Sequence, residues 1–526
     1  MPKNPLPSAI IAWSAIFASF STASAAPSRP NIIYVLCDDL GYGDVRYLNP
    51  EGKIATPNLD RLAAEGIAFT DAHSGSAVCT PTRYGILTGR YAWRSPLQSH
   101  VLGGLSPRLI EAGRFTVARL LKQNGYHTAC VGKWHLGMDW ARLPGKPIEE
   151  LGIEKPDQVH NVDYSQPITN GPQSVGFDYY YGISASADMV PYTFIENDHV
   201  TVLPTAEKSF PLMHGRPERQ SRVGPAAPDF EVSKILPTFT SKAIGYLRSR
   251  AEAAKQGEPF FLYLPLASPH SPINPSSAWE GKSGLNPYAD FVMETDDAIG
   301  QVMRTLDELG IADNTMFLLT SDNGCSTVAD IPELVAKGHH PSYVFRGQKA
   351  DIYDGGHRVP FIVRWPARVE AGRKSDHLQC HTDFMATVAE ILGVKLPDTA
   401  AEDSISFLKT LVSSDAQPQR EVIVHHSVTG AFAIRKGTWK LEFCPGSSGW
   451  SHPRPGVDDQ SRLPLVQLYN LAGDIAEQSN QQAEQAKIVA ELTELMQRQV
   501  NEGRSTPGAP QQNTVSVDFW KAGKSD

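Results

Sequence analysis

The stretch NIIYVLCDD, residues 31–39, is a continuous apolar run that stops at two carboxylates. Such a run is typical of a strand buried on both faces of a parallel sheet, and the carboxylates predict a polar loop directly after it. Similar strands alternate with segments of helical spacing further along the chain: TPNLDRLAAEGIAF, FTVARLLKQNG, HTACVGKWHLG, PFFLYLPLASPH, ADFVMETDDAIGQVMRTLDELG and TMFLLTSDNG. This alternation predicts an α/β fold with a large, mostly parallel sheet flanked by helices.

The pattern changes near Arg420. Three short apolar stretches, REVIVHHS, AFAIRKG and TWKLEFC, predict a short antiparallel sheet, and QAKIVAELTELMQRQVNEG predicts a helix after a loop rich in Pro, Gly and Ser. We therefore expect a large domain at residues 27–419, a smaller α+β domain at 420–503 and a loosely ordered tail at 504–526.

The N-terminus has the features of an export signal. Lys3 precedes an apolar run, residues 9–20, and the small residues Ala23-Ser24-Ala25 follow it. The run is short for a membrane span, so we expect a signal peptide at residues 1–26, a secreted or periplasmic protein and no stable membrane insertion. An uncleaved membrane anchor is the alternative. The formal net charge of −9 offers no broad basic surface, which argues against nucleic acid as a partner.

Polar residues gather where the predicted strands end. They are Asp38, Asp39, Lys133, His135, His270, Asp322 and Asn323. Because ligands bind outside the carboxyl ends of strands in open α/β sheets, we expect these residues to converge in one cleft. The acidic and amide oxygens suit calcium or magnesium better than zinc. Taken singly, Asp-Asp and Asp-Asn pairs are more often turn residues.

The stretch VCTPTRYGILTGR places Cys79 directly before a predicted helix. Thr80 suits the N-cap of that helix and Gly89 its end. A helix start favours anions, and Arg83 adds a positive charge in the first turn. The commoner fate of a lone cysteine is structural burial. The six cysteines are too few and too scattered for a disulfide framework and show no zinc spacing.

Two further segments carry a cation or a proton carrier. In VGKWHLG, Lys133 and His135 lie on the same side if the segment is extended, which pairs a cation with a titratable group. Lys349 precedes the apolar stretch PFIVRWP, and His270 lies between two prolines. Each of these residues, taken alone, is equally an ordinary solvated or loop residue.

The motifs together resemble one family. DDLGYGD, TPNLDRLAAEGIAF, CTPTRYGILTGR, GYHTACVGKWHLG, SDNG and GGHRVPFIVRWP occur in the order seen in formylglycine-dependent sulfatases of the arylsulfatase type, in the alkaline phosphatase superfamily. The resemblance runs from about Asn31 to Pro366, and LYNLAGDIAEQSN near the C-terminus also fits. It implies an alkaline phosphatase-like fold and a hydrolase acting on a sulfated carbohydrate or another sulfate ester.

The resemblance implies a role for each matching residue. A formylglycine-generating maturation enzyme would oxidise Cys79 to formylglycine, whose hydrate would attack sulfur. Calcium, rather than magnesium, would be held by Asp38, Asp39, Asp322, Asn323 and the modified Cys79. Sulfate oxygens would be bound by Lys133, Lys349 and Ser186.

The remaining roles also follow from the resemblance. Arg83 would hold the formylglycine, His270 would protonate the leaving oxygen, and His135 would take a proton from the hydrate. His357 and Arg358 match a recurring family segment and are candidates for structural roles. Asp188, His339 and His340 are candidates for lining the substrate pocket.

Two alternatives stay open at this point. A phosphonate or phosphodiester hydrolase of the same superfamily would use a similar nucleophile and metal cleft. A non-catalytic binder of sulfated glycans would keep Cys79 as a thiol, but it would need neither histidine as acid or base.

Overall fold

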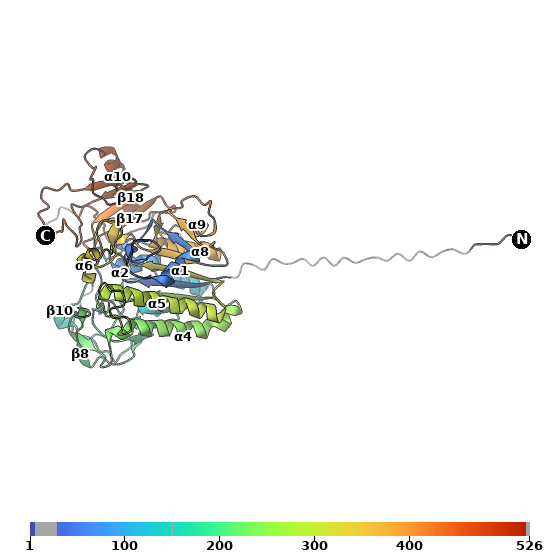
Figure 1. The fold of residues 1–526 in the computed structure, drawn as a ribbon, viewed down its shortest axis with the longest axis horizontal. Coiled ribbons are helices and arrows are strands. Elements are labelled where there is room, and N and C mark those ends of the chain that lie inside the picture. Colours follow the sequence, from blue (N-terminus) through green and yellow to red (C-terminus); the bar gives the residue numbers. More distant parts are fainter. Residues whose placement is uncertain (6–28, 149–150, 522–526) are drawn as a thin grey trace.

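The computed structural model describes residues 1–5, 29–148 and 151–521. A large sheet lies between helical layers, and a smaller sheet with helix α10 lies at one end of the molecule (Figure 1). Residues 6–26 of the predicted signal peptide lie outside the described part of the chain.

The large sheet has a parallel centre. Its ten strands, in spatial order, are β15 (Arg373–Ser375), β2 (Ile67–Phe69), β14 (Phe361–Arg364), β13 (Thr315–Ser321), β1 (Asn31–Cys37), β12 (Phe260–Pro265), β4 (His127–Lys133), β5 (Tyr179–Ile183), β6 (Ile195–Glu196) and β7 (His199–Val200). The five strands from β13 to β5 are mutually parallel, whereas β14 and β6 pair antiparallel with their neighbours. The predicted mostly parallel sheet is confirmed.

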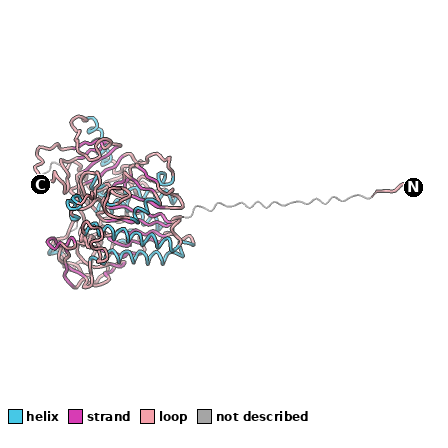
Figure 2. Tube along the Cα trace, viewed as in Figure 1, coloured by secondary structure: helices cyan, strands magenta, loops and turns pink. Residues whose placement is uncertain are grey.

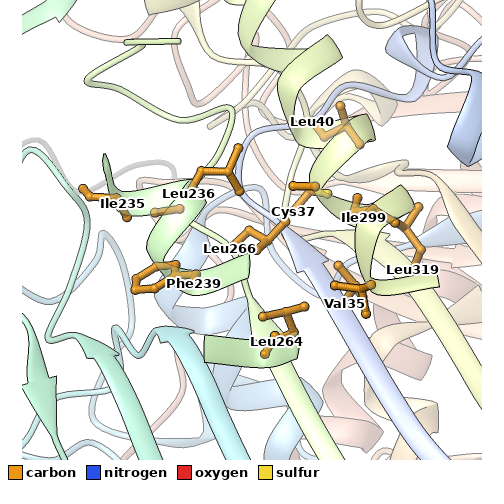
Figure 3. Packing of buried hydrophobic residues seen from close by; sticks show 14 of the residues in the cluster. Val35, Cys37, Leu40, Ile235, Leu236, Phe239, Leu264, Leu266, Ile299 and Leu319 are labelled. Carbon is orange, nitrogen blue, oxygen red and sulfur yellow. The ribbon is translucent and has the colours of Figure 1, made fainter. Parts of the chain in front are cut away.

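Strand β1 is buried on both faces, as its apolar run predicts. Val35 and Cys37 point toward one helical layer, where they join Phe239 of α4 (Ile235–Lys255) and Ile299 of α5 (Pro287–Leu309) in one apolar cluster (Figure 3). The alternate residues of the strand, including Tyr34, belong to a second cluster on the opposite face. Burial of both faces fixes the strand, and hence the loop that follows it, inside a rigid layer.

The other helices are short except at the C-terminus. They are α1 (Pro57–Ala64), α2 (Cys79–Thr88), α3 (Val117–Gln123), α6 (Ile331–Ala336), α7 (Asp354–His357), α8 (Phe384–Leu392), α9 (Leu408–Val412) and α10 (Ala486–Asn501). Helix α2 ends at Gly89, whose φ of 63° suits a residue without a side chain. The long helices α4 and α5 run side by side below the sheet (Figure 2). No helix within the described residues has both the length and the apolar character that crossing a membrane requires.

The smaller sheet is antiparallel. It contains β17 (Val422–His426), β18 (Phe432–Lys436), β19 (Trp439–Glu442) and β20 (Gln467–Asn470) in that order. Helix α10 covers it, with Leu492 and Met496 buried in the same cluster as Phe432. The predicted C-terminal unit of short strands and one helix is confirmed.

The segment after Gly503 differs from the loose tail that the sequence predicts. Residues 504–521 contain no helix or strand but pack along the body of the protein. Phe519 is only 3% exposed, and the Thr514 amide donates to the Arg94 carbonyl at 2.8 Å. The polar composition that predicts a tail does not reveal these few anchoring contacts. Residues 522–526 lie outside the described residues.

Candidate active site

The candidate site lies at the carboxyl ends of the parallel strands. Each parallel strand leads to part of it: Asp322 and Asn323 after β13, Asp38 and Asp39 after β1, His270 after β12, Lys133 at the end of β4, and Ser186 after β5. Because these strand ends meet at one edge, distant residues become neighbours. The Asn323 amide, for example, donates to the Asp39 carboxylate at 2.7 Å across 284 positions.

Helix α2 begins at Cys79, which is buried in its first turn. The predicted N-cap at Thr80 is wrong. Val78 holds the cap position with an extended backbone, and the Thr80 hydroxyl accepts a hydrogen bond from the Leu102 amide instead. The helix therefore starts two residues earlier than a Thr80 cap would imply and directs its N-terminal end at the strand ends, where it favours anions.

Arg83 ties helix α2 to the sheet. Its guanidinium donates to one Asp322 carboxylate oxygen at 2.7 and 3.2 Å and to the Lys133 carbonyl at 3.0 Å. The Asp38 carboxylate lies 3.5 Å from the same group. Arg83 is fully buried, so these three partners fix the position of Cys79 one helical turn away.

The acidic residues form a compact group that fits a hard divalent cation. One ligand atom from each of Asp38, Cys79 and Asp322 lies within 4.8 Å of the others. Burial and the neighbouring Asp38 carboxylate raise the pKa of Asp322 to about 6, which shows how closely the negative charges are crowded. Asp38 Oδ1 and Asn323 Oδ1 are buried and, within the described residues, accept no hydrogen bond. Oxygen atoms of this kind are suitable calcium ligands.

Two lysines bring positive charge to the same group. Lys133 Nζ donates to Asp38 Oδ2 at 2.5 Å and to the Ser186 hydroxyl at 2.7 Å. Lys349 Nζ lies 2.6 Å from Asp39 Oδ1. Burial disfavours the Lys349 ammonium, but the Asp39 carboxylate outweighs this and raises the lysine pKa above its ordinary value. The Lys349 side chain therefore stays charged near the cavity.

His270 has one ring nitrogen free for chemistry. Its Nδ1 donates to the Ser271 carbonyl at 2.6 Å. Its Nε2 lies 3.7 Å from the Asp39 carboxylate and 3.4 Å from the Ser186 hydroxyl. The ring is 7% exposed and lines the cavity described below, so Nε2 can deliver a proton to a bound group.

His135 is near the same residues, but not as the sequence spacing suggests. Strand β4 ends at Lys133, and His135 has a φ of 55°, so the extended arrangement of the two side chains does not occur. His135 Nε2 donates to the Leu102 carbonyl at 2.8 Å, while its buried Nδ1 has no partner within the described chain. Burial, with Lys133 and Arg83 nearby, lowers the pKa of His135 well below its usual value. The neutral ring thus keeps Nδ1 as a proton acceptor.

A cavity of about 590 Å³ opens over Cys79, Ser186, His270 and Lys349. The rest of its wall is formed by Val78, Pro96, Leu97, Gln98, Ser99, His100, Val101, Leu151, Gly152, Ile153, Asp188, Met189, Val428 and Trp450. Its volume is in the range of small-molecule sites. Cys79 and Lys349 connect the cavity to the buried acidic group, and its wall combines apolar residues with polar ones such as His100 and Asp188.

The remaining candidates divide between the cavity and other places. Asp188 lines the cavity, and its buried Oδ1 has no partner in the described chain. His339 does not line it, because its ring bonds the Asp44 carboxylate at 2.8 Å. His357 stacks on His425 of the small sheet, with ring centres 3.8 Å apart.

Sequence patterns gave no signal for several cavity residues. Trp450 comes from the predicted Pro/Gly/Ser-rich loop, and His100 from an irregular segment. Arg358 donates to the Thr70 carbonyl at 2.7 Å, away from the cavity, and His340 is exposed outside it. Loops of this kind have no periodicity from which their fold can be predicted.

The comparison with protein families decides the family of this chain. The sequence profile of the family described as Sulfatase matches residues 30–394, which include every residue of the acidic group and the lysines beside it. The chain belongs to the sulfatase family. A second sulfatase profile, described as N-sulphoglucosamine sulphohydrolase, C-terminal, matches residues 346–445.

Individual sulfatases resemble the chain over most of its length. An N-acetylgalactosamine-6-O-sulfatase from Bacteroides thetaiotaomicron is 36% identical, over 89% of this chain and 93% of its own. The bovine arylsulfatase A is 30% identical over 87% of this chain and 84% of its own. A solved sulfatase structure from work on glycosaminoglycan metabolism by B. thetaiotaomicron is 34% identical, with a TM-score of 0.75, and covers 90% of this chain and 99% of its own. The sulfatase is therefore a sulfuric ester hydrolase, which sets aside both the phosphoester hydrolase and the non-catalytic binder.

Proposed function

We propose that this sulfatase removes the 6-O-sulfate of N-acetylgalactosamine units in sulfated glycosaminoglycans, using formylglycine made from Cys79 and a calcium ion. The observation that carries the chemistry is the cavity that ends on Cys79 beside buried carboxylates and cations. The choice of sugar is supported by the similarity to N-acetylgalactosamine-6-sulfatases of B. thetaiotaomicron and of human, the latter 28% identical over 94% of this chain.

The surroundings of Cys79 favour its conversion over direct use of the thiol. Burial raises the pKa of the Cys79 thiol, although Lys133 and Lys349 oppose the rise. A cysteine nucleophile needs a lowered pKa, because the thiolate is the reactive form. Formylglycine at position 79 supplies, as its hydrate, a hydroxyl nucleophile that needs no thiolate. Its formation requires a maturation enzyme as a partner of this chain.

The unsatisfied oxygens support a metal ion at this position. Asp38, Asp39, Asp322 and Asn323 would hold calcium, with residue 79 completing the set. A bound calcium ion supplies positive charge that offsets the negative charge of the sulfate group. Magnesium fits less well, since it usually keeps several waters and binds through one or two carboxylates, whereas this group offers three carboxylates and an amide.

The chain's own side chains bind the sulfate and move protons. Ser186 and Lys349 line the cavity, and Lys133 Nζ lies 2.7 Å from the Ser186 hydroxyl. The three would donate hydrogen bonds to sulfate oxygens, which offsets charge on the anion as the ester bond breaks. His270 acts in its doubly protonated form: the Nδ1 proton stays hydrogen-bonded to the Ser271 carbonyl, and the Nε2 proton passes to the sugar oxygen as the sulfur–oxygen bond opens. His135 accepts a proton at Nδ1 from the residue at position 79.

The chain is secreted or periplasmic in this proposal, because its first residues have the pattern of a cleaved export signal. Export would bring the enzyme to extracellular glycans. The same setting supplies calcium at concentrations that a site of several carboxylates can bind.

The test is sulfate release from defined sugars. Protein produced with a formylglycine-generating enzyme is incubated with N-acetylgalactosamine 6-sulfate, with the 4-sulfate, and with 4-nitrophenyl phosphate, and released anions are quantified by ion chromatography. The unmodified protein should release sulfate from N-acetylgalactosamine 6-sulfate. The Cys79→Ala protein should release none from the same sugar. Preference for the 4-sulfate would refute the sugar assignment, and full activity of Cys79→Ala would refute the nucleophile.

A further inference from the structure

One wall of the cavity is a loop without regular structure. All six residues from Pro96 to Val101 line the cavity, and none belongs to a helix or strand. A wall of this kind keeps its shape only through contacts from other elements. The source of those contacts therefore matters for substrate binding.

The loop is held at three points by its neighbours. The Gln98 side chain donates to the Trp93 carbonyl at 2.6 Å, and the His100 amide donates to the Val428 carbonyl at 2.7 Å. The third contact comes from the far end of the chain. Lys521 Nζ donates to the Gln98 carbonyl at 2.8 Å.

Residues 504–521, here called the C-terminal strap, run along the segment that leads into this loop. The Arg94 guanidinium donates to the Asn513 side chain at 2.9 Å, and the Thr514 amide donates to the Arg94 carbonyl at 2.8 Å. Phe519 is 3% exposed and packs against Phe443, with ring centres 5.0 Å apart. The strap is thus anchored on both sides of the approach to the loop before it reaches Lys521.

Lys521 itself is placed closely. Its ammonium lies 5.5 Å from the centre of the Phe432 ring, which is a cation–π distance. A side chain added at Gly430 would meet the Gln98 carbonyl at 2.2 Å and Lys521 Nζ at 2.6 Å, so the three groups pack without spare room. Burial lowers the pKa of Lys521, as expected for an ammonium held in such a place.

We propose that the C-terminal strap positions the substrate-binding wall 96–101, and that Lys521 is the positioning residue that couples the two. This inference rests on the proposed function in taking the cavity over Cys79 as the substrate site. Lys521 is not a cavity-lining residue, so it acts only through the Gln98 carbonyl. Without that bond the loop samples other shapes, and substrate binding has to order it first.

The test compares Lys521→Met with Lys521→Arg, and Lys487→Met serves as a matched control because Lys487 is an exposed lysine of α10. Loss of a hydrogen bond to a charged group predicts a rise of about tenfold in KM for the sulfated sugar. The expected kcat and Tm are those of the unmodified protein, since the strap keeps its Arg94 and Phe519 anchors. Arginine can reach the same carbonyl and should restore KM.

Hydrogen exchange provides a readout that does not depend on activity. The peptide covering residues 95–103 should exchange faster in Lys521→Met than in the unmodified protein or in Lys487→Met. Unchanged exchange of this peptide would overturn the proposal, as would a fall of Tm and kcat together with the change in KM. Failure of the unmodified enzyme to release sulfate would refute the proposed function instead, and the exchange experiment would still decide the role of the strap.

Discussion

Replacing His270 with glutamine should separate substrates by the quality of their leaving groups. Nδ1 of His270 is committed to the Ser271 carbonyl at 2.6 Å, so Nε2 is the nitrogen that can protonate a leaving oxygen. A sugar alkoxide needs that proton, whereas 4-nitrophenolate leaves readily as an anion. The two substrates should therefore respond differently to the same change.

The size of the difference follows from general acid catalysis. Loss of a positioned acid costs roughly 10²–10⁴-fold in rate, which is about 3–5 kcal/mol in the barrier. We expect kcat/KM for N-acetylgalactosamine 6-sulfate to fall by at least about 100-fold. For 4-nitrophenyl sulfate the fall should be less than about tenfold, because little proton transfer is needed in that transition state.

The assay measures kcat/KM for both esters on the same enzyme preparations. His199→Gln, a change at an exposed histidine on β7, is the matched control. Calcium content is measured alongside, since His270 Nε2 lies 3.7 Å from the Asp39 carboxylate. Equal losses for the two substrates at normal calcium content would refute the assignment of His270 as the acid.

Three further predictions concern the metal, a buried ion pair and pH. Asn323→Ala should weaken calcium binding because the buried Asn323 Oδ1 is a free ligand atom. At a calcium concentration of 100 times the Kd, calcium should raise the free energy of unfolding of the unmodified enzyme by about 2.7 kcal/mol, and with it the Tm. An equal effect of calcium on Asn323→Ala would contradict the site. Lys440→Met should lower the free energy of unfolding by about 3–5 kcal/mol, because it leaves buried carboxylates unpaired. Lys440 Nζ lies 2.9 Å from Asp354 and 2.6 Å from Glu477, both fully buried. A loss below about 1 kcal/mol in chemical denaturation would refute this prediction. Burial lowers the pKa of His381 to about 3, below the ordinary 6.5, so its contribution to the free energy of unfolding is fully present above pH 6.5 and is lost as pH falls toward 3. Between these pH values, the free energy of unfolding should fall by up to about 1.4 kcal/mol per pH unit more than it does in His381→Gln. Parallel pH profiles of the two proteins would contradict this prediction.

The central fold could be predicted because its signals are local. The run that becomes β1 is apolar at every position, and only a strand covered on both faces buries such a run. The neighbouring strands are also apolar runs. Because ligand sites form outside the carboxyl ends of parallel strands, Asp38, Lys133 and Asp322 could then be predicted to lie together. Each step used the order of residues along the chain.

Finer geometry could not be predicted because it depends on contacts between distant segments. Thr80 looks like an N-cap in the sequence, but its hydroxyl serves the Leu102 amide, and the helix starts at Cys79. The chain turns at His135, where φ is positive, so strand spacing no longer applies. The strap 504–521 packs through isolated residues such as Phe519, which carry no periodic pattern.

The most direct test of formylglycine at position 79 is the mass of the tryptic peptide Leu62–Arg83, which contains Cys79. It is measured in protein that releases sulfate, with and without treatment by an aldehyde-specific hydrazide. We expect a peptide carrying the aldehyde in place of the thiol, and a hydrazide adduct that abolishes turnover. A fully active preparation in which this peptide carries only the unmodified thiol would contradict this expectation.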